Sequence, residues 1–221
     1  LNNRINGSIE VYEKETKDLL SVVPVPAGAN LTNLLLTNVG DMRNRGVEFN
    51  MGVEASKNEN FSWEFNLNAT HYKSEITNLA STSVLTGGIS GGTGSTIQVH
   101  AEGYQPNAFY VYQQVYNQQG KPIEGVYVDR NGDGIINSGD LYQYKSPAPE
   151  LLLGFSSRFT YKNWDLGFTM RASFGNYVYN NQASQYGNLQ GTKLNNYLQN
   201  VHVSYLDTKF ETSQYFSDYY I

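Results

Sequence analysis

Residues 46–71 read GVEFNMGVEAS KNEN FSWEFNLNATH, two eleven-residue arms in which apolar and polar side chains alternate. The four residues between the arms, 57–60, are polar and form a short turn signal. Successive side chains of a strand point to opposite faces, so a period of two separates apolar from polar positions. The pattern predicts a β-hairpin with one apolar face and one polar face.

A second hairpin of the same design follows later in the chain. Residues 151–161 and 164–174 again alternate, and the turn between them is Lys162-Asn163. A weaker alternation near the start sets Ile5, Gly7, Ile9 and Val11 opposite Asn6, Ser8, Glu10 and Tyr12. These arms are expected to be neighbouring strands of one antiparallel sheet.

The length of the arms suggests what the strands are for. Strands of globular proteins run about five or six residues. Eleven residues at roughly 3.3 Å each, tilted by about 45°, span about 25 Å, the height of the apolar band of an outer-membrane barrel. The polar faces carry charged groups, which a dry core would bury at high cost and a wet lumen accepts. These charged residues are Glu48, Glu54, Glu64, Arg158, Asp165 and Arg171.

The connections differ in length in the same sense. The segments 57–60 and 162–163 are tight turns, whereas 17–40, 74–97, 117–150 and 175–220 are long. Trp63 and Trp164 stand near the tight turns, where an interfacial aromatic belt would lie. The prediction is an all-β fold, an antiparallel transmembrane β-barrel segment with long extracellular loops and short periplasmic turns, without a domain boundary. The alternative is a soluble β-sandwich with its apolar faces inward.

Composition excludes several other classes of protein. The 221 residues carry a net charge of -5, which argues against a nucleic-acid partner held by counterion release. There are no cysteines, and the three histidines show no ligand-like spacing, so disulfide scaffolds, zinc knuckles and thiol nucleophiles are not expected. No apolar run is long enough for a membrane helix. No constellation typical of an enzyme is present, and we expect no catalytic activity.

One loop has the spacing of a calcium site. Residues 129–140 read DRNGDGIINSGD, which matches a twelve-residue calcium-binding loop with Gly134 at the sharp turn. Ile135 would offer its carbonyl, and Asp140 replaces the usual bidentate Glu. A structural Ca²⁺ is therefore expected, and the alternative is an Asp/Asn/Gly turn that binds no cation tightly. The predicted metal ligands are Asp129, Asn131, Asp133, Ile135, Asn137 and Asp140.

Aromatic residues before this loop allow two interpretations. They would stack on sugar rings of a ligand, or they are ordinary aromatic residues at strand ends, and the second interpretation is favoured for most of them. The residues are Tyr104, Phe109, Tyr110, Tyr112 and Tyr116. Together with the calcium loop they support the alternative function, a soluble, calcium-stabilised β-sandwich module that binds carbohydrate. No residue of the chain identifies a ligand.

Several motifs, in order along the chain, resemble SusC/RagA-type TonB-dependent outer-membrane transporters. The resemblance covers most of residues 1–180 and is looser beyond. It rests on RINGSIEVYEKETKDLL at 4–20, NVGDMRNRGVE at 38–48 with the FSWEFNLN hairpin, GYQPNAFY at 103–110, the 129–140 loop and PELLLGF at 149–155. The chain is expected to be the C-terminal portion of such a barrel, a fragment without the plug domain or the final strand.

The resemblance implies a function beyond what spacing shows. The architecture that the resemblance implies is a barrel of about 22 strands with an N-terminal plug. Such transporters import glycans or peptides, are energised by the TonB-ExbB-ExbD complex through the N-terminal part, and carry a SusD-like surface lipoprotein as a lid. The implied location is the outer membrane of a Gram-negative, Bacteroidetes-like cell, with outer-membrane lipid around the wall.

Overall fold

The computed structural model of the protein describes residues 4–28, 31–79, 83–86 and 97–212. The chain divides into two compact units, where the sequence predicted no boundary. Unit 1 comprises residues 1–81 and 148–176, and unit 2 comprises residues 82–147 and 177–221. Within the described ranges, no helix has both the length and the apolar composition needed to cross a membrane.

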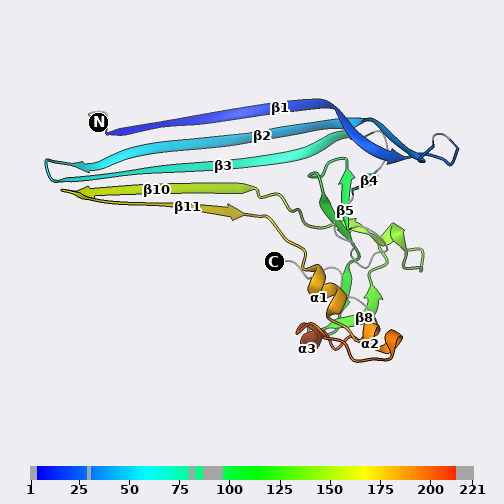
Figure 1. Ribbon diagram of the computed structural model, residues 1–221. Coiled ribbons are helices and arrows are strands. Elements are labelled where there is room, and N and C mark those ends of the chain that lie inside the picture. Colours follow the sequence, from blue (N-terminus) through cyan, green and yellow to red (C-terminus); the bar gives the residue numbers. More distant parts are fainter. Residues whose placement is uncertain (1–3, 29–30, 80–82, 87–96, 213–221) are drawn as a thin grey trace. The chain divides into compact units, whose positions relative to one another are not determined.

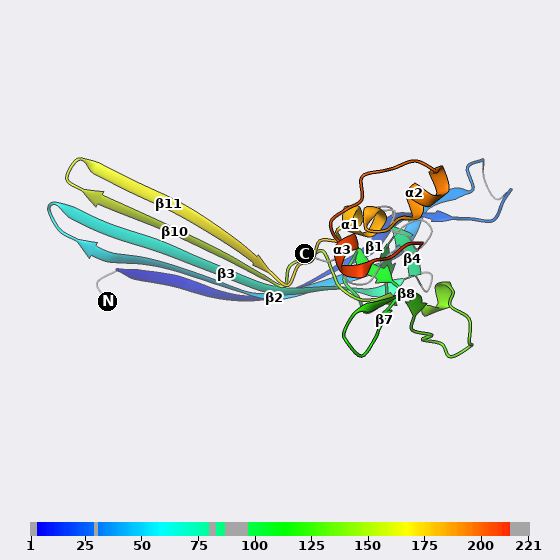
Figure 2. The ribbon, with the colours of Figure 1, turned by 90° about the horizontal axis from the view of Figure 1, so that it is seen from below.

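Unit 1 is a single antiparallel sheet with the strand order β1-β2-β3-β10-β11. Figures 1 and 2 show these strands lying side by side along their length. The predicted hairpins are confirmed, and β10 and β11 have the predicted bounds. The strands are β1 (Ile5–Pro24), β2 (Leu34–Lys57), β3 (Phe61–Leu79), β10 (Leu151–Tyr161) and β11 (Trp164–Phe174).

The register aligns the alternating patterns of all five strands. Phe49 of β2 stands opposite Ile9 of β1 and Ala69 of β3, and Ala69 stands opposite Leu153 of β10. We call the side of the sheet that carries these residues the apolar face, and the opposite side the polar face. Because the side-chain period is two, a slip by one residue would mix the two faces.

Strands β1 and β2 are longer than the sequence predicted. The segment 17–40 was expected to be a long loop, but most of it is strand, since Leu19–Pro24 pairs with residues 34–40. The ladder continues past an irregularity after Thr16, where Asp18 has a φ of 58°. Apolar residues follow one another directly in these segments (LLSVVP at 19–24 and LLLTNVG at 34–40), so a search for strict alternation did not reveal them.

In its described residues, unit 2 combines short strands with three short helices. Its strands are β4 (Ser83–Thr86), β5 (Gln98–Ala101), β6 (Ala108–Val111), β7 (Gln114–Tyr116), β8 (Pro122–Tyr127) and β9 (Tyr142–Gln143). The turn η1 (Ser138–Asp140) ends the 129–140 loop, and α1 (Asn181–Tyr186), α2 (Gln190–Asn195) and α3 (Tyr205–Thr208) lie in a segment predicted to be a loop. Its buried cluster consists of Ile97, Phe109, Val111 and Tyr179.

Candidate functional site

The apolar face of unit 1 is open along much of its length. Trp164 is 80% exposed, Val11 78% and Ile9 71%. Within the described residues of unit 1, no second sheet packs on this face, whereas a β-sandwich buries its apolar faces between two sheets. The arrangement is that of a membrane wall, whose outward side chains are covered by lipid.

The polar face carries carboxylates in unfavourable positions for a dry interior. Glu10 stands directly opposite Glu48, and Glu54 stands directly opposite Glu64. Like charges facing each other across a ladder repel, and burying them without a partner is costly. The polar face is therefore the side of the sheet that faces water, as expected for the lumen of a barrel.

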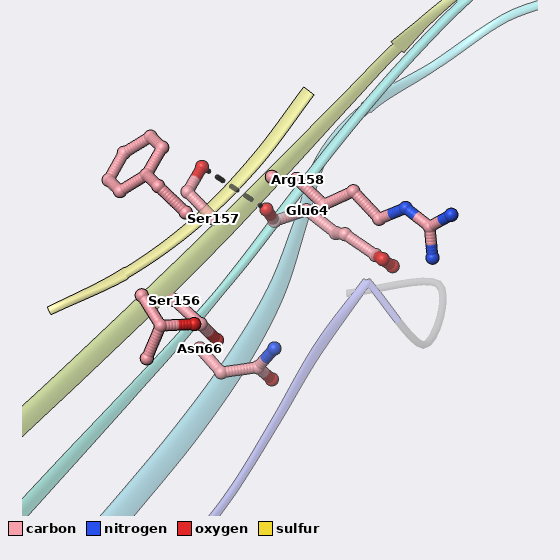
Figure 3. Close-up of a pocket in the computed structure, with 8 residues that line it drawn as sticks. Glu64, Asn66, Ser156, Ser157 and Arg158 are labelled. Atoms are coloured by element: carbon pink, nitrogen blue, oxygen red, sulfur yellow. Dashed lines mark hydrogen bonds between the residues drawn. The ribbon is translucent and has the colours of Figure 1, made fainter. Parts of the chain in front are cut away.

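A hollow of about 380 Å³ lies along β3, β10 and β11. Figure 3 shows the side chains of Glu64 and Arg158 on one side of the strands and that of Ser157 on the other. Arg158 donates from Nε to both carboxylate oxygens of Asp165, at 3.1 and 2.9 Å, and Glu64 faces Arg158 across the ladder. The hollow thus presents fixed charges and hydroxyl groups to solvent, without a nucleophile–base pair.

On the polar face, two of the glycines leave room for a neighbouring side chain to lie over the strand. A Cβ atom on Gly154 would meet the Asn68 side-chain oxygen at 2.5 Å, and one on Gly46 would meet the Tyr12 ring at 2.9 Å. The amide of Asn68 and the ring of Tyr12 lie over backbone that has no side chain of its own. Glycine at these positions allows a larger neighbour to cover the strand.

The loop brings the six residues predicted to bind calcium close together. In this structure, hydrogen bonds among these residues and to the backbone hold them. The Asp129 carboxylate accepts from the backbone N–H of Gly132 at 2.7 Å and of Gly134 at 2.8 Å. Asn131 donates to the Asp133 carboxylate at 2.9 Å, and Asn137 donates to the carbonyl oxygen of Ile135 at 3.3 Å. The predicted Ile135 carbonyl thus already accepts a hydrogen bond.

Asp140 closes this loop from inside. It is fully buried, and its carboxylate accepts from the backbone N–H groups of Asn137, Arg130 and Asn131. These donors, Asn137 first, lower the pKa of Asp140 below its ordinary value because they stabilise the charged form. Among the described residues there is no group of three or more His, Cys, Asp or Glu side chains placed to hold a metal ion. Calcium binding by this loop stays a prediction.

The aromatic residues of unit 2 mostly serve its packing. Phe109 is buried in the core, and Tyr112 stacks on Tyr127 with ring centroids 5.1 Å apart. Tyr142, which the sequence did not single out, lies under the Arg130 guanidinium at 4.6 Å and ties the 129–140 loop to β9. Burial raises the pKa of Tyr142 to about 12, so its hydroxyl stays neutral at physiological pH.

A second hollow, of about 290 Å³, lies in the helical segment of unit 2, between α1, α2 and residues 199–201. Its lining holds amide, hydroxyl and apolar groups and no ionisable acid or base apart from the phenol of Tyr186. Asn188 is a buried residue of this lining. A hydrogen bond holds its side chain in place, since the Asn188 side-chain oxygen accepts from the backbone N–H of Gln190 at 3.0 Å. Such a lining matches neutral, polar ligands, but the sequence showed no signal for it because its residues are scattered amides.

The open apolar face, the wet polar face and the paired strands define the class of the protein, a transmembrane β-barrel wall. A family model described as TonB dependent receptor-like, beta-barrel matches residues 1–217. The chain belongs to this family of outer-membrane proteins, which are receptors and transporters rather than enzymes.

The chain is 40% identical to the TonB-dependent receptor SusC of Bacteroides thetaiotaomicron over 236 aligned residues, which cover all of this chain and 23% of SusC. It is 31% identical to TonB-dependent receptor P26 of Formosa agariphila, over 81% of this chain and 19% of that protein. The chain thus spans about a fifth of the curated relatives that it matches. The predicted resemblance to SusC/RagA-type proteins is confirmed.

The fold is also found in solved structures. The structure of the RagAB peptide transporter matches with a TM-score of 0.64 at 22% identity, over 85% of this chain and 21% of that one. The closed-closed state of the RagAB peptide importer matches with a TM-score of 0.66 at 23% identity, over 86% and 21%. These likenesses support the barrel fold, and the alternative of a soluble sandwich module is not favoured.

Proposed function

We propose that the chain is the C-terminal portion of the barrel of a SusC/RagA-type importer that takes up glycans or peptides. The observation that carries the proposal is the 40% identity to SusC along the whole of this chain. The similarity to the RagAB peptide transporter supports peptides as one substrate class. In this function the chain binds and guides substrate and carries out no catalytic step.

The two faces of the sheet support this role. A water-facing wall with charged and amide groups suits a lumen through which polar molecules pass, and the apolar face suits surrounding lipid. The neutral hollow lined by Gln185, Gln190 and Gln199 suits uncharged hydroxyl or amide groups of a glycan or a peptide backbone. A SusD-like lipoprotein would close the outer end, and the TonB-ExbB-ExbD complex would supply energy through a part of the protein outside this chain.

The test is uptake by cells that carry or lack the complete transporter. Labelled neutral oligosaccharides and labelled peptides are offered separately, and cells lacking TonB serve as the control for energised import. We expect loss of uptake of one substrate class on deletion, and co-purification of a surface lipoprotein with the intact transporter in mild detergent. Unchanged uptake of both classes and no lipoprotein partner would overturn the proposal.

A further inference from the structure

We infer that the outer boundary of the bilayer's hydrocarbon crosses the sheet between two neighbouring rows of residues. The last row inside is Val11–Val47–His71–Leu151, and the first row outside is Glu13–Arg45–Lys73. The residues beyond this line face the polar head-group layer. The inference rests on the outer-membrane location and assigns to this chain a lipid contact surface and a head-group contact surface.

Below the line, the outward side chains suit lipid tails. On the apolar face, the rows from Val11–Val47–His71–Leu151 down to the short turns carry aliphatic, methionine and aromatic side chains, glycine, alanine, His71, Ser157 and, opposite Trp63, Ser56. Ser157 is buried and accepts a hydrogen bond from the Trp63 indole N–H at 3.0 Å. His71 donates from Nδ1 to the carbonyl oxygen of Glu150 at 3.0 Å, so its polar atom is not left without a partner.

Above the line, the same face becomes charged in three strands at once. The six residues of two successive rows, which we call the charged strip, are all ionisable: Glu13, Arg45, Lys73, Glu15, Arg43 and Glu75. The strip continues the period of two, so these side chains project from the same face as Val11 and Val47. Charged side chains on the lipid face are strongly disfavoured in the middle of a bilayer and tolerated near its interfaces.

The strip is internally paired except at one cation. Arg43 contacts Glu13 at 3.8 Å and Glu15 at 3.3 Å, and Lys73 contacts Glu75 at 2.8 Å. Arg45 is exposed and forms no ion pair with any residue in the described ranges. A guanidinium in this position suits the phosphate groups of lipid head groups, which accept paired hydrogen bonds.

The lower end of the apolar face gives an independent check on this line. The row Phe61–Tyr161–Trp164 directly precedes the short turns, so β10 and β11 cross from one boundary to the other in eleven residues. Eleven residues at roughly 3.3 Å, tilted by about 45°, rise about 25 Å, which equals the apolar band of such barrels. Strands β1, β2 and β3 continue for further residues, and that extra length starts at the charged strip.

The test uses single cysteines in the complete transporter, because this chain contributes no cysteine of its own. Any thiols elsewhere in the protein are first replaced. Val47→Cys and Arg45→Cys form a matched pair, two residues apart on one face of β2, and Val11→Cys and Glu13→Cys repeat the comparison on β1. Each variant is labelled on intact cells with a membrane-impermeant maleimide, after its presence in the outer membrane has been verified by fractionation.

We expect labelling of the Arg45→Cys and Glu13→Cys variants to be on the order of tenfold faster than that of Val47→Cys and Val11→Cys, with all four labelling fully in detergent. Equal rates within both pairs would overturn the boundary, even if substrate uptake is normal. If one variant fails to assemble, the pair on the other strand decides. Absence of the unaltered protein from the outer membrane would instead contradict the location on which the inference rests.

Discussion

Aromatic side chains differ in solvent exposure between the sheet of unit 1 and the small core of unit 2. Phe168 in β11 is 43% exposed, whereas Phe109 in β6 is 2% exposed. Unit 2 buries a small apolar cluster around Phe109 among its own residues. Unit 1 leaves its apolar side chains open, and in the outer membrane lipid covers them. Stability therefore has different sources in the two units, and substitutions should separate them.

The largest expected effect is in the core of unit 2. Phe109→Ala removes a ring that packs against Tyr179 at 6.3 Å between centroids, and truncations of this kind cost about 3–5 kcal/mol. We expect a clear drop in the thermal midpoint of the purified transporter. The matched control is Phe168→Ala, where lipid fills the vacated space and the midpoint should move little. Equal drops would show that the two rings are buried alike.

The second-largest loss of stability is expected when a charge is placed on the apolar face. Met170→Arg places a guanidinium near the middle of the lipid-facing band, at an expected cost of about 2–4 kcal/mol. Its control is Thr169→Arg on the adjacent polar face, where water solvates the charge. The measurement is the free energy of unfolding in lipid vesicles, together with the amount assembled in the outer membrane. Similar costs for both variants would contradict the assignment of the two faces.

A smaller, local effect is expected at the acidic loop of unit 2. If calcium binds there as the sequence predicts, millimolar Ca²⁺ should slow tryptic cleavage after Arg130 in the intact transporter, and a chelator should restore it. The Asp133→Asn variant should lose this protection, while Asp207→Asn, outside the loop, should keep it. Cleavage that does not respond to Ca²⁺ would mean that the hydrogen bonds of the loop alone close it and that the calcium prediction is wrong.

The smallest effect is expected at the charged strip of unit 1. Arg43→Ala breaks contacts to Glu13 and Glu15, both more than half exposed, and such surface pairs contribute about 0–1 kcal/mol. The same substitution made at Arg45, which has no such contact, is the control. We expect thermal midpoints within a few degrees of the parent protein for both. A large loss at Arg43 alone would indicate that the strip is buried against another part of the protein.

The sequence predicted unit 1 far better than unit 2, for a physical reason. Odd-numbered residues from Leu151 in β10 and even-numbered residues from Trp164 in β11 meet one environment, so period and turn define both strands to the residue. In β1 and β2 the same period continues, but its outward residues change from Val11 to Glu13, and a search for apolar alternation stops there. The Glu-x-Glu of 13–15 and the Arg-x-Arg of 43–45 would have extended the strands.

Unit 2 was harder because its elements are too short to show a period. Helices of four to six residues, such as α3, give no repeating stripe, and the small strands around Phe109 resemble loop sequence. The spacing of residues 129–140 predicted a calcium-binding loop, and calcium binding there stays a prediction. It did not reveal that Asp140 is buried and bonded to three backbone N–H groups, because that depends on how the chain closes.

The lack of a covering layer on the sheet of unit 1 also constrains the order of events during biogenesis. A strand pair that gains no buried apolar surface in water has little reason to persist there. Leu166, Met170 and Phe174 would instead attract other exposed chains during transit to the membrane. Pairing of β10 with β11 and entry into lipid should therefore be one cooperative step, and until that step these apolar side chains need another cover against water.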